Sequence, residues 1–250
     1  MKLTRQHIYI IFIALLFILL IVIVERKSAK KICKKVVVRV DDEYQNYFVG
    51  EDDVLRLVSH VEGGVIGKVQ REIDLKKIEL KVETNKFVHD AQVYSDIKGD
   101  VVVDVYQKRP IARIIYPHGD GAYISQDGII LPLSKKFTSR VLLIYGDYTQ
   151  NFIGHFFTKK DQGIAMVKLM QYLDKDPFLK AQVAEINIDS KGNMIFYTQI
   201  GKQYIQFGQP SDWENKFDKI KMAYKEIIPS KGWAHYQRID VRFKDQIICE

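Results

Sequence analysis

The residue types that most often carry enzymatic chemistry occur in this chain, but their spacing matches no catalytic or metal-binding pattern. The acidic runs at 41–43 and 51–53 lack the glycine spacing of a calcium loop. The histidines are scattered without the spacing of metal ligands, so each is expected to be a surface or capping residue. They are His7, His60, His89, His118, His155 and His235. We predict no metal site and no cofactor.

Nucleotide binding and nucleophilic catalysis are not indicated either. Gly63, Gly64 and Gly67 are not followed by the Gly-Lys-Ser or Gly-Lys-Thr of a phosphate-binding loop. No Gly-x-Ser-x-Gly sequence is present, and Cys249 at the end of the chain is a poor place for a sheltered nucleophile. We therefore predict that the protein is not an enzyme. Whether Cys33 and Cys249 form a bridge or stay free thiols remains open.

The first element of the chain is an apolar segment. Residues 8–24 read IYIIFIALLFILLIVIV and contain no charge. In a helix, about seventeen residues reach most of the way across a hydrocarbon core of roughly 30 Å. The run is longer than the apolar region of a cleaved signal and no Ala-x-Ala follows it. We predict a short tail over 1–7, a single transmembrane helix over 8–24 and a basic linker over 25–35.

The chain carries 38 Lys and Arg against 31 Asp and Glu. A good part of this excess lies in and around the linker, at Arg26, Lys27, Lys30, Lys31, Lys34 and Lys35. These side chains suit either anionic lipid head groups or a solvated linker, and both interpretations stay open. Nucleic acid is not implied. Because only Lys2 and Arg5 precede the apolar run, the charge bias alone would place the body of the protein in the cytoplasm.

The pattern after the linker predicts a small domain over 36–109. A β-branched strand at 36–40 precedes a short helix over 54–58, and Asp74 is a plausible N-cap for a second helix. Two segments with alternating apolar residues follow, at 87–94 and 101–106. The order is β-α-α-β-β.

The remaining residues, 110–250, predict a mostly antiparallel β domain with two helices, so the fold class is α+β. One helix is expected over 163–173. The other opens with Ser211 and Glu214 spaced as a capping box and ends at Pro229. The final segment, 236–248, is predicted to be mostly extended.

This organisation resembles the FtsQ/DivIB family of bacterial cell-division proteins, whose first extracytoplasmic domain is a POTRA domain. Residues 83–93 (ETNKFVHDAQV) are similar to the family pattern E-x-N-P-x-V-x-x-A-x-V, with Lys86 where proline is usual. Residues 105–112 (VYQKRPIA) resemble its exit from the POTRA domain. Since Pro110 fixes its own φ and removes a backbone donor, we predict an interdomain hinge at Gln107, Arg109 and Pro110.

The second domain resembles the form of FtsQ found in the Bacteroidetes lineage. Residues 205–208 (IQFG) and 216–220 (KFDKI) match one family pattern, and residues 236–247 (YQRIDVRFKDQI) match the closing pattern best. The resemblance implies a non-enzymatic scaffold of the divisome that links early and late division proteins for septal cell-wall synthesis. It also implies an inner-membrane location at the septum, with the N-terminus cytoplasmic and the bulk periplasmic, against the charge bias.

The resemblance further implies binding of FtsB/FtsL-type coiled-coil bitopic proteins at the C-terminal end, with other divisome members contacting the POTRA domain. The contact residues carried over are Phe243, Lys244, Asp245, Gln246 and Ile247. A strand over 238–244 with Ile239, Val241 and Phe243 on its inner side would accept an added strand if it lies at a sheet edge. The sequence does not show which strand is the edge, nor the oligomeric state. The alternative function is a POTRA protein of outer-membrane polypeptide transport or assembly.

Overall fold

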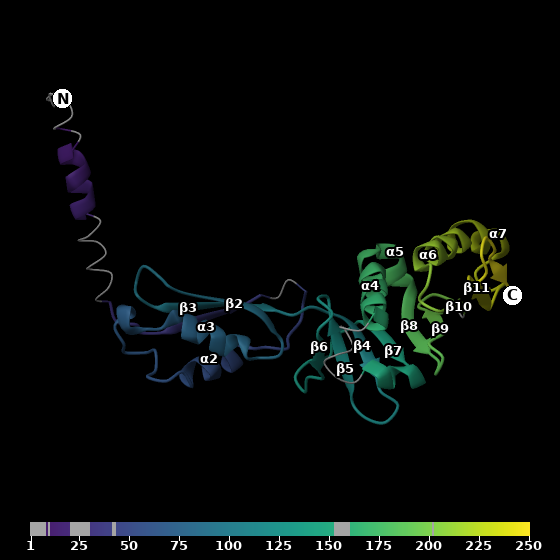
Figure 1. The fold of residues 1–250 in the computed structure, drawn as a ribbon, viewed down its shortest axis with the longest axis horizontal. Coiled ribbons are helices and arrows are strands. Elements are labelled where there is room, and N and C mark those ends of the chain that lie inside the picture. Colours follow the sequence, from purple (N-terminus) through teal and green to yellow (C-terminus); the bar gives the residue numbers. More distant parts are fainter. Residues whose placement is uncertain (1–8, 10, 21–30, 42–43, 153–160, 202) are drawn as a thin grey trace. The chain divides into compact units, whose positions relative to one another are not determined.

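The computed structural model describes residues 9, 11–20, 31–41, 44–152, 161–201 and 203–250 (Figure 1). The prediction of a transmembrane helix over 8–24 is wrong. Among the described residues, no helix combines the length and the apolar character needed to cross a bilayer. The longest described helical run in that segment is 11–20, about 15 Å long against a hydrocarbon core of roughly 30 Å.

The chain divides into two compact units, unit 1 over Met1–Gln107 and unit 2 over Lys108–Glu250. The folded part of unit 1 has the order β-α-α-β-β, as predicted, with a short 3₁₀ turn before the second helix. Its elements are β1 (Val36–Val40), α2 (Glu51–Ser59), η1 (Gln70–Glu72), α3 (Leu75–Glu83), β2 (Val88–Ser95) and β3 (Val101–Gln107). The central strand β3 pairs with β1 in parallel and with β2 antiparallel.

Both helices of unit 1 lie on one face of its sheet (Figure 1). The carboxylate of Asp74 accepts a hydrogen bond from the Lys77 N–H at 3.0 Å, so Asp74 is the N-cap of α3, as predicted. Ile78 and Val82 on this helix are buried, as are Val54 and Val58 on α2. These apolar faces and the inner face of the sheet form the core of unit 1.

Unit 2 contains a nine-stranded sheet in the described part of the chain, with strand order β12-β11-β10-β9-β8-β7-β4-β5-β6. Most neighbouring pairs are antiparallel, and β7 is parallel to both β4 and β8, as β10 is to β11. The strands are β4 (Pro110–Ile115), β5 (Gly121–Ser125), β6 (Ile130–Pro132), β7 (Leu142–Tyr145), β8 (Val183–Ile188), β9 (Met194–Thr198), β10 (Tyr204–Gly208), β11 (Arg238–Asp240) and β12 (Ile248–Cys249).

The helical elements of unit 2 differ from the two that the sequence predicts. A short helix that was not predicted, α5, follows α4, and its N-cap is Asp176. The described helical elements are η2 (Asp147–Phe152), α4 (Asp161–Lys175), α5 (Pro177–Gln182), α6 (Trp213–Met222), the π-helical turn η4 (Ala223–Ile227) and α7 (Ile228–Lys231). Their buried side chains share one core with the inner face of the sheet. This core contains Phe196, Phe207 and Phe217.

Two predicted helix ends in unit 2 are wrong. The residue before α6 is Asp212 in left-handed geometry, with no side-chain cap, so Ser211 and Glu214 do not form a capping box. Pro229 does not end the second helix, because the chain continues through η4 and α7 to Lys231. A proline would lose one i→i−4 bond and clash with the carbonyl four residues earlier. The wider π turn just before it is a known way to absorb such a defect.

Candidate partner-binding site

The predicted contact residues lie on the turn between β11 and β12. The prediction of an extended segment over 236–248 is wrong in part, because β11 ends at Asp240 and the chain turns before β12 begins. Phe243 does not face the core as predicted but is 46% exposed, and Lys244, Asp245 and Gln246 are exposed as well. Only Ile247 packs partly against the core. We call residues 243–247 the C-terminal turn.

The structure shows which strands form the edges of this sheet. The sequence left the edge strand open; β11 lies between β10 and β12, so the edge at this end is β12. Arg238 and Glu250 exchange hydrogen bonds of 2.9 and 3.0 Å. Because bonded pairs alternate along an antiparallel ladder, the N–H and C=O of Cys249 point away from β11. A partner strand could pair with this side of β12.

The opposite edge of the sheet is less suited to strand addition. It is β6, which contains Pro132 opposite Ala122. Proline has no N–H to offer an added strand, and edge prolines are a common means of blocking such pairing. Of the two edges, β12 is therefore the one better suited to strand addition.

An ion pair between the buried Asp240 and the exposed Arg242 lies just before the C-terminal turn. Arg242 donates from Nε and Nη2 to the two carboxylate oxygens of Asp240, at 2.9 and 2.6 Å, and its backbone N–H donates to the same group at 3.1 Å. Burial acts to raise the pKa of Asp240, but the bonds and charge of Arg242 outweigh it and hold the pKa below its usual range. The guanidinium also lies 5.7 Å from the centre of the Phe243 ring.

Two further residues of this site, Lys219 and Gly208, lie in sequence motifs to which no role in the site was assigned. The Lys219 ammonium on α6 donates to the carbonyls of Val241 and Phe243, at 3.3 and 2.5 Å. Gly208 has a φ of 71°, and a Cβ there would lie 3.0 Å from Cγ of Arg242. The motifs IQFG and KFDKI, which contain Gly208 and Lys219, were the sequence signal that could have pointed to these residues. The result is an exposed turn, held at its start by side-chain contacts, beside an open strand edge.

The three predicted hinge residues belong to two different units. The Gln107 side chain is held within unit 1, where it accepts from the Val49 N–H at 3.0 Å and donates to the carbonyls of Asp41 and Asn46. Pro110 begins β4 in unit 2 and is buried. The side chain of Gln107 is therefore anchored immediately before the boundary.

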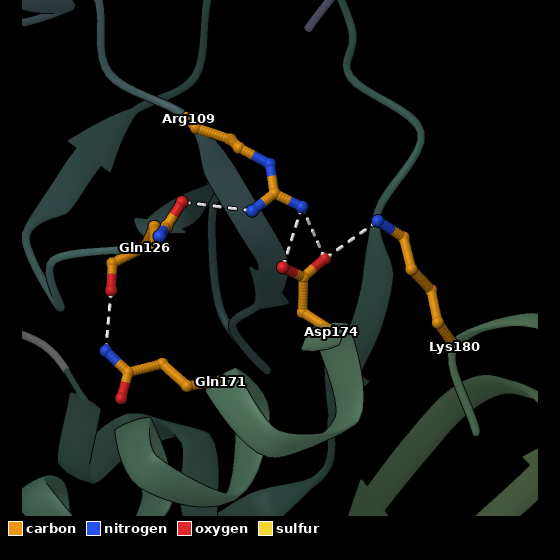
Figure 2. A network of polar contacts seen from close by, with 5 residues as sticks. All are labelled: Arg109, Gln126, Gln171, Asp174 and Lys180. Atoms are coloured by element: carbon orange, nitrogen blue, oxygen red, sulfur yellow. Dashed lines mark hydrogen bonds and ion pairs between the residues drawn. The ribbon is translucent and has the colours of Figure 1, made fainter. Parts of the chain in front are cut away.

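Arg109 is held just as firmly within unit 2 (Figure 2). Its Nη2 atom lies 2.8 and 2.7 Å from the two carboxylate oxygens of Asp174, and its Nη1 donates to Gln126 at 3.0 Å. Lys180 approaches the same carboxylate at 2.9 Å, and Gln171 donates to the Gln126 carbonyl at 2.6 Å. This cluster fastens the first residues of unit 2 to the C-terminal end of α4.

The described residues contain no group of three or more His, Cys, Asp or Glu side chains that could hold a metal ion. His7 and His155 lie outside the described residues. Both thiols are free: Cys33 is fully buried in unit 1, and Cys249 is partly buried in unit 2. Burial raises the pKa of the Cys249 thiol, so it stays protonated and is a poor nucleophile.

The fold and the site together describe a POTRA-like unit followed by a β-rich unit with an open C-terminal edge. Comparison with protein families agrees: residues 31–106 match the POTRA-like domain family, and residues 109–250 match the family "FtsQ/DivIB, C-terminal related". None of the curated proteins compared with this chain matches it significantly. Because the second match covers more than half of the chain, this protein belongs to the FtsQ/DivIB family. Membership indicates a role in cell division.

Proposed function

We propose that this protein is a non-enzymatic scaffold of the divisome that binds FtsB/FtsL-type coiled-coil bitopic proteins. The observation that carries the proposal is the open edge of β12 next to the exposed C-terminal turn. Backbone pairing along β12 would supply affinity, and Phe243, Lys244, Asp245 and Gln246 would supply side-chain specificity. Through these contacts the scaffold would link early and late division proteins during septal cell-wall synthesis.

The POTRA-like unit would provide a second contact, with other divisome members. Its sheet has edges at β1 and β2, and β2 is eight residues long. We propose that the two units bind different partners, because each has its own sheet and core.

The short connection between the units would act as the hinge. Gln107 and Arg109 are each anchored to their own unit, so bending would be confined to the backbone around Lys108. Spin labels on the two units would test this. Gln107→Ala or Arg109→Ala should broaden the distribution of label distances, and an unchanged distribution would contradict the hinge.

The proposed location is the periplasmic side of the inner membrane, concentrated at the division septum. Family membership supports it, whereas the charge bias of the sequence does not. A fluorescent fusion should concentrate at mid-cell in dividing cells. Protease added to spheroplasts should degrade residues 36–250, and protection until lysis would refute the periplasmic side.

The partner proposal is tested by crosslinking in cells, capture of the protein from membranes and identification of the proteins that co-purify. Coiled-coil division proteins should be recovered with the unaltered chain and lost with Phe243→Asp, while Lys225→Glu, an exposed change on η4, should keep them. Recovery of outer-membrane precursors in place of division proteins would contradict the proposal.

A further inference from the structure

One end of unit 1 combines exposed isoleucines with a group of lysines. This is the end at which the chain enters the unit, since β1 starts beside β3 with Val36 opposite Val101. The turn between β2 and β3, residues 96–100, lies at the same end because Ser95 also faces Val101. Figure 1 shows this turn and the loop between α2 and α3 at the end where the chain enters.

Direct contacts join these three segments. Ile32 forms a β-bridge with Val69, and the Cys33 N–H donates to the Lys68 carbonyl at 2.9 Å. The buried carboxylate of Asp100 accepts from the backbone N–H groups of Lys34 and Lys35, at 3.1 Å each. Residues 31–35 are thus part of the folded unit rather than a loose linker.

The turn between β2 and β3 also packs closely against the incoming chain. Lys31 donates to the Ile97 carbonyl. Gly99 has a φ of 94°, and a Cβ there would lie 2.6 Å from Cβ of Lys31. Such close packing holds Ile97 in a fixed position.

Three isoleucines of these segments point into solvent. Ile32 is 51% exposed, Ile66 is 68% exposed and Ile97 is 89% exposed. Ile66 lies between Gly64 and Gly67, which both adopt left-handed geometry. Both glycines belong to the group at 63–67 that is not followed by the Gly-Lys-Ser or Gly-Lys-Thr of a phosphate-binding loop. Their structural effect is to bring an isoleucine to the surface while its neighbour Val65 is buried.

Lysines occur in the same three segments as the isoleucines. They are Lys31, Lys34, Lys35, Lys68 and Lys98. The carboxylates of Asp96 and Asp100 accept hydrogen bonds from backbone N–H groups but keep their negative charge, and Glu62 pairs with Lys77 at 2.8 Å, so the five lysines still leave a net positive charge here. The opposite charges of the exposed residues Arg71 and Glu72 cancel each other. We call the three isoleucines and five lysines the Lys–Ile patch.

We propose that the Lys–Ile patch docks on the surface of an anionic phospholipid membrane. Isoleucines at loop tips can enter the boundary between head groups and acyl chains, while lysines in the same segments attract anionic head groups. Charge complementarity favours this occupant over an apolar protein surface. Ten residues separate the first residue of the patch, Lys31, from the exposed apolar residues 11–20 of the same chain. The proposal does not depend on partner binding at β12.

Fluorescence of single tryptophans added to the full chain tests the proposal. Ile97→Trp and Ile66→Trp report from the patch, and Leu80→Trp on α3, where the leucine is 54% exposed, is the matched control. Each variant is mixed with phosphatidylglycerol/phosphatidylcholine vesicles containing brominated lipid. Trp213 and Trp233 give the same background in all variants. The patch variants should be quenched clearly more than the control.

Charge variants complete the test. Replacing Lys34 or Lys98 by alanine in the Ile97→Trp chain should lower the ratio of vesicle-bound to free protein, and each replacement should lower it about fivefold. Raising the salt concentration should lower it as well. Quenching no greater at Ile97→Trp than at Leu80→Trp would overturn the proposal. Equal quenching of Ile97→Trp in vesicles of phosphatidylcholine alone, with the same brominated lipid, would also overturn it.

Discussion

The two units of this protein expose different kinds of surface. The described part of unit 1 has three strands and presents exposed isoleucines at the end where the chain enters. The described part of unit 2 has nine strands and presents an open edge, next to an exposed turn whose start is held by side-chain contacts. The difference suggests a division of labour, in which loop tips of unit 1 meet a surface and the strand edge of unit 2 meets a polypeptide.

Removing a core aromatic side chain should have the largest effect on stability and should show whether the two units unfold independently. Phe217 is fully buried and lies within 5.1 Å of both Tyr172 and Phe207, measured between ring centres. Phe217→Ala should destabilise unit 2 by about 3–5 kcal/mol because it leaves a cavity. Hydrogen exchange should speed up in unit 2 alone.

Ile78→Ala is the matching change in unit 1, where Ile78 is 1% exposed. It should cost about 2–5 kcal/mol and speed exchange in unit 1 alone. Exchange that rises in both units after either substitution would show that the two cores unfold together, contrary to the comparison above.

The polar cluster at the start of unit 2 should give an intermediate effect. Arg109→Ala removes two bonds to Asp174 and one to Gln126, and should cost about 1–3 kcal/mol with faster exchange in β4. Lys180→Ala removes an ion pair from a side chain that is 55% exposed, and should cost less than about 1 kcal/mol. Denaturant unfolding measures both, and equal costs would refute the view that Arg109 is the anchor.

The smallest effect expected is a pH dependence from Asp240. Its pKa is lower in the folded state than in the unfolded chain, so its contribution to stability is complete above the unfolded value of about 4. That contribution is lost as the pH falls through the folded pKa. Unfolding of the unaltered chain should therefore become easier below about pH 4, and Asp240→Asn should flatten this part of the curve. An identical pH profile for the two proteins would exclude Asp240 as its source.

Local signals made the fold of residues 36–107 predictable, whereas the apolar run at 8–24 gave a wrong prediction of a transmembrane helix. The β-α-α-β-β order follows from the spacing of apolar residues, and the Asp74 cap from a residue adjacent to its helix. The helix extension past Pro229 was not predictable in the same way. It depends on a π turn that forms where the helix packs against the core, and neither end of that turn has a sequence signal.

The site was predictable by position but not by conformation. Alternation of Ile239, Val241 and Phe243 indicates a continuing strand, yet β11 stops at Asp240. The strand ends there, and Lys219, more than twenty residues earlier, binds the carbonyls of Val241 and Phe243 just beyond it, a contact that no local pattern contains. The identity of the edge strand depends on the order of all nine strands, which no local pattern contains.

The central claim is that the edge of β12 and the C-terminal turn bind the coiled-coil partner. Cys249→Pro removes an N–H that points away from β11, and Phe243→Asp changes an exposed aromatic side chain, so both variants should keep the fold.

The decisive measurement is the affinity of each variant for the purified FtsB/FtsL-type partner, made beside its thermal unfolding. We expect about thirtyfold weaker binding, which corresponds to about 2 kcal/mol, with little change in unfolding temperature. Unchanged affinity in both folded variants would contradict the account.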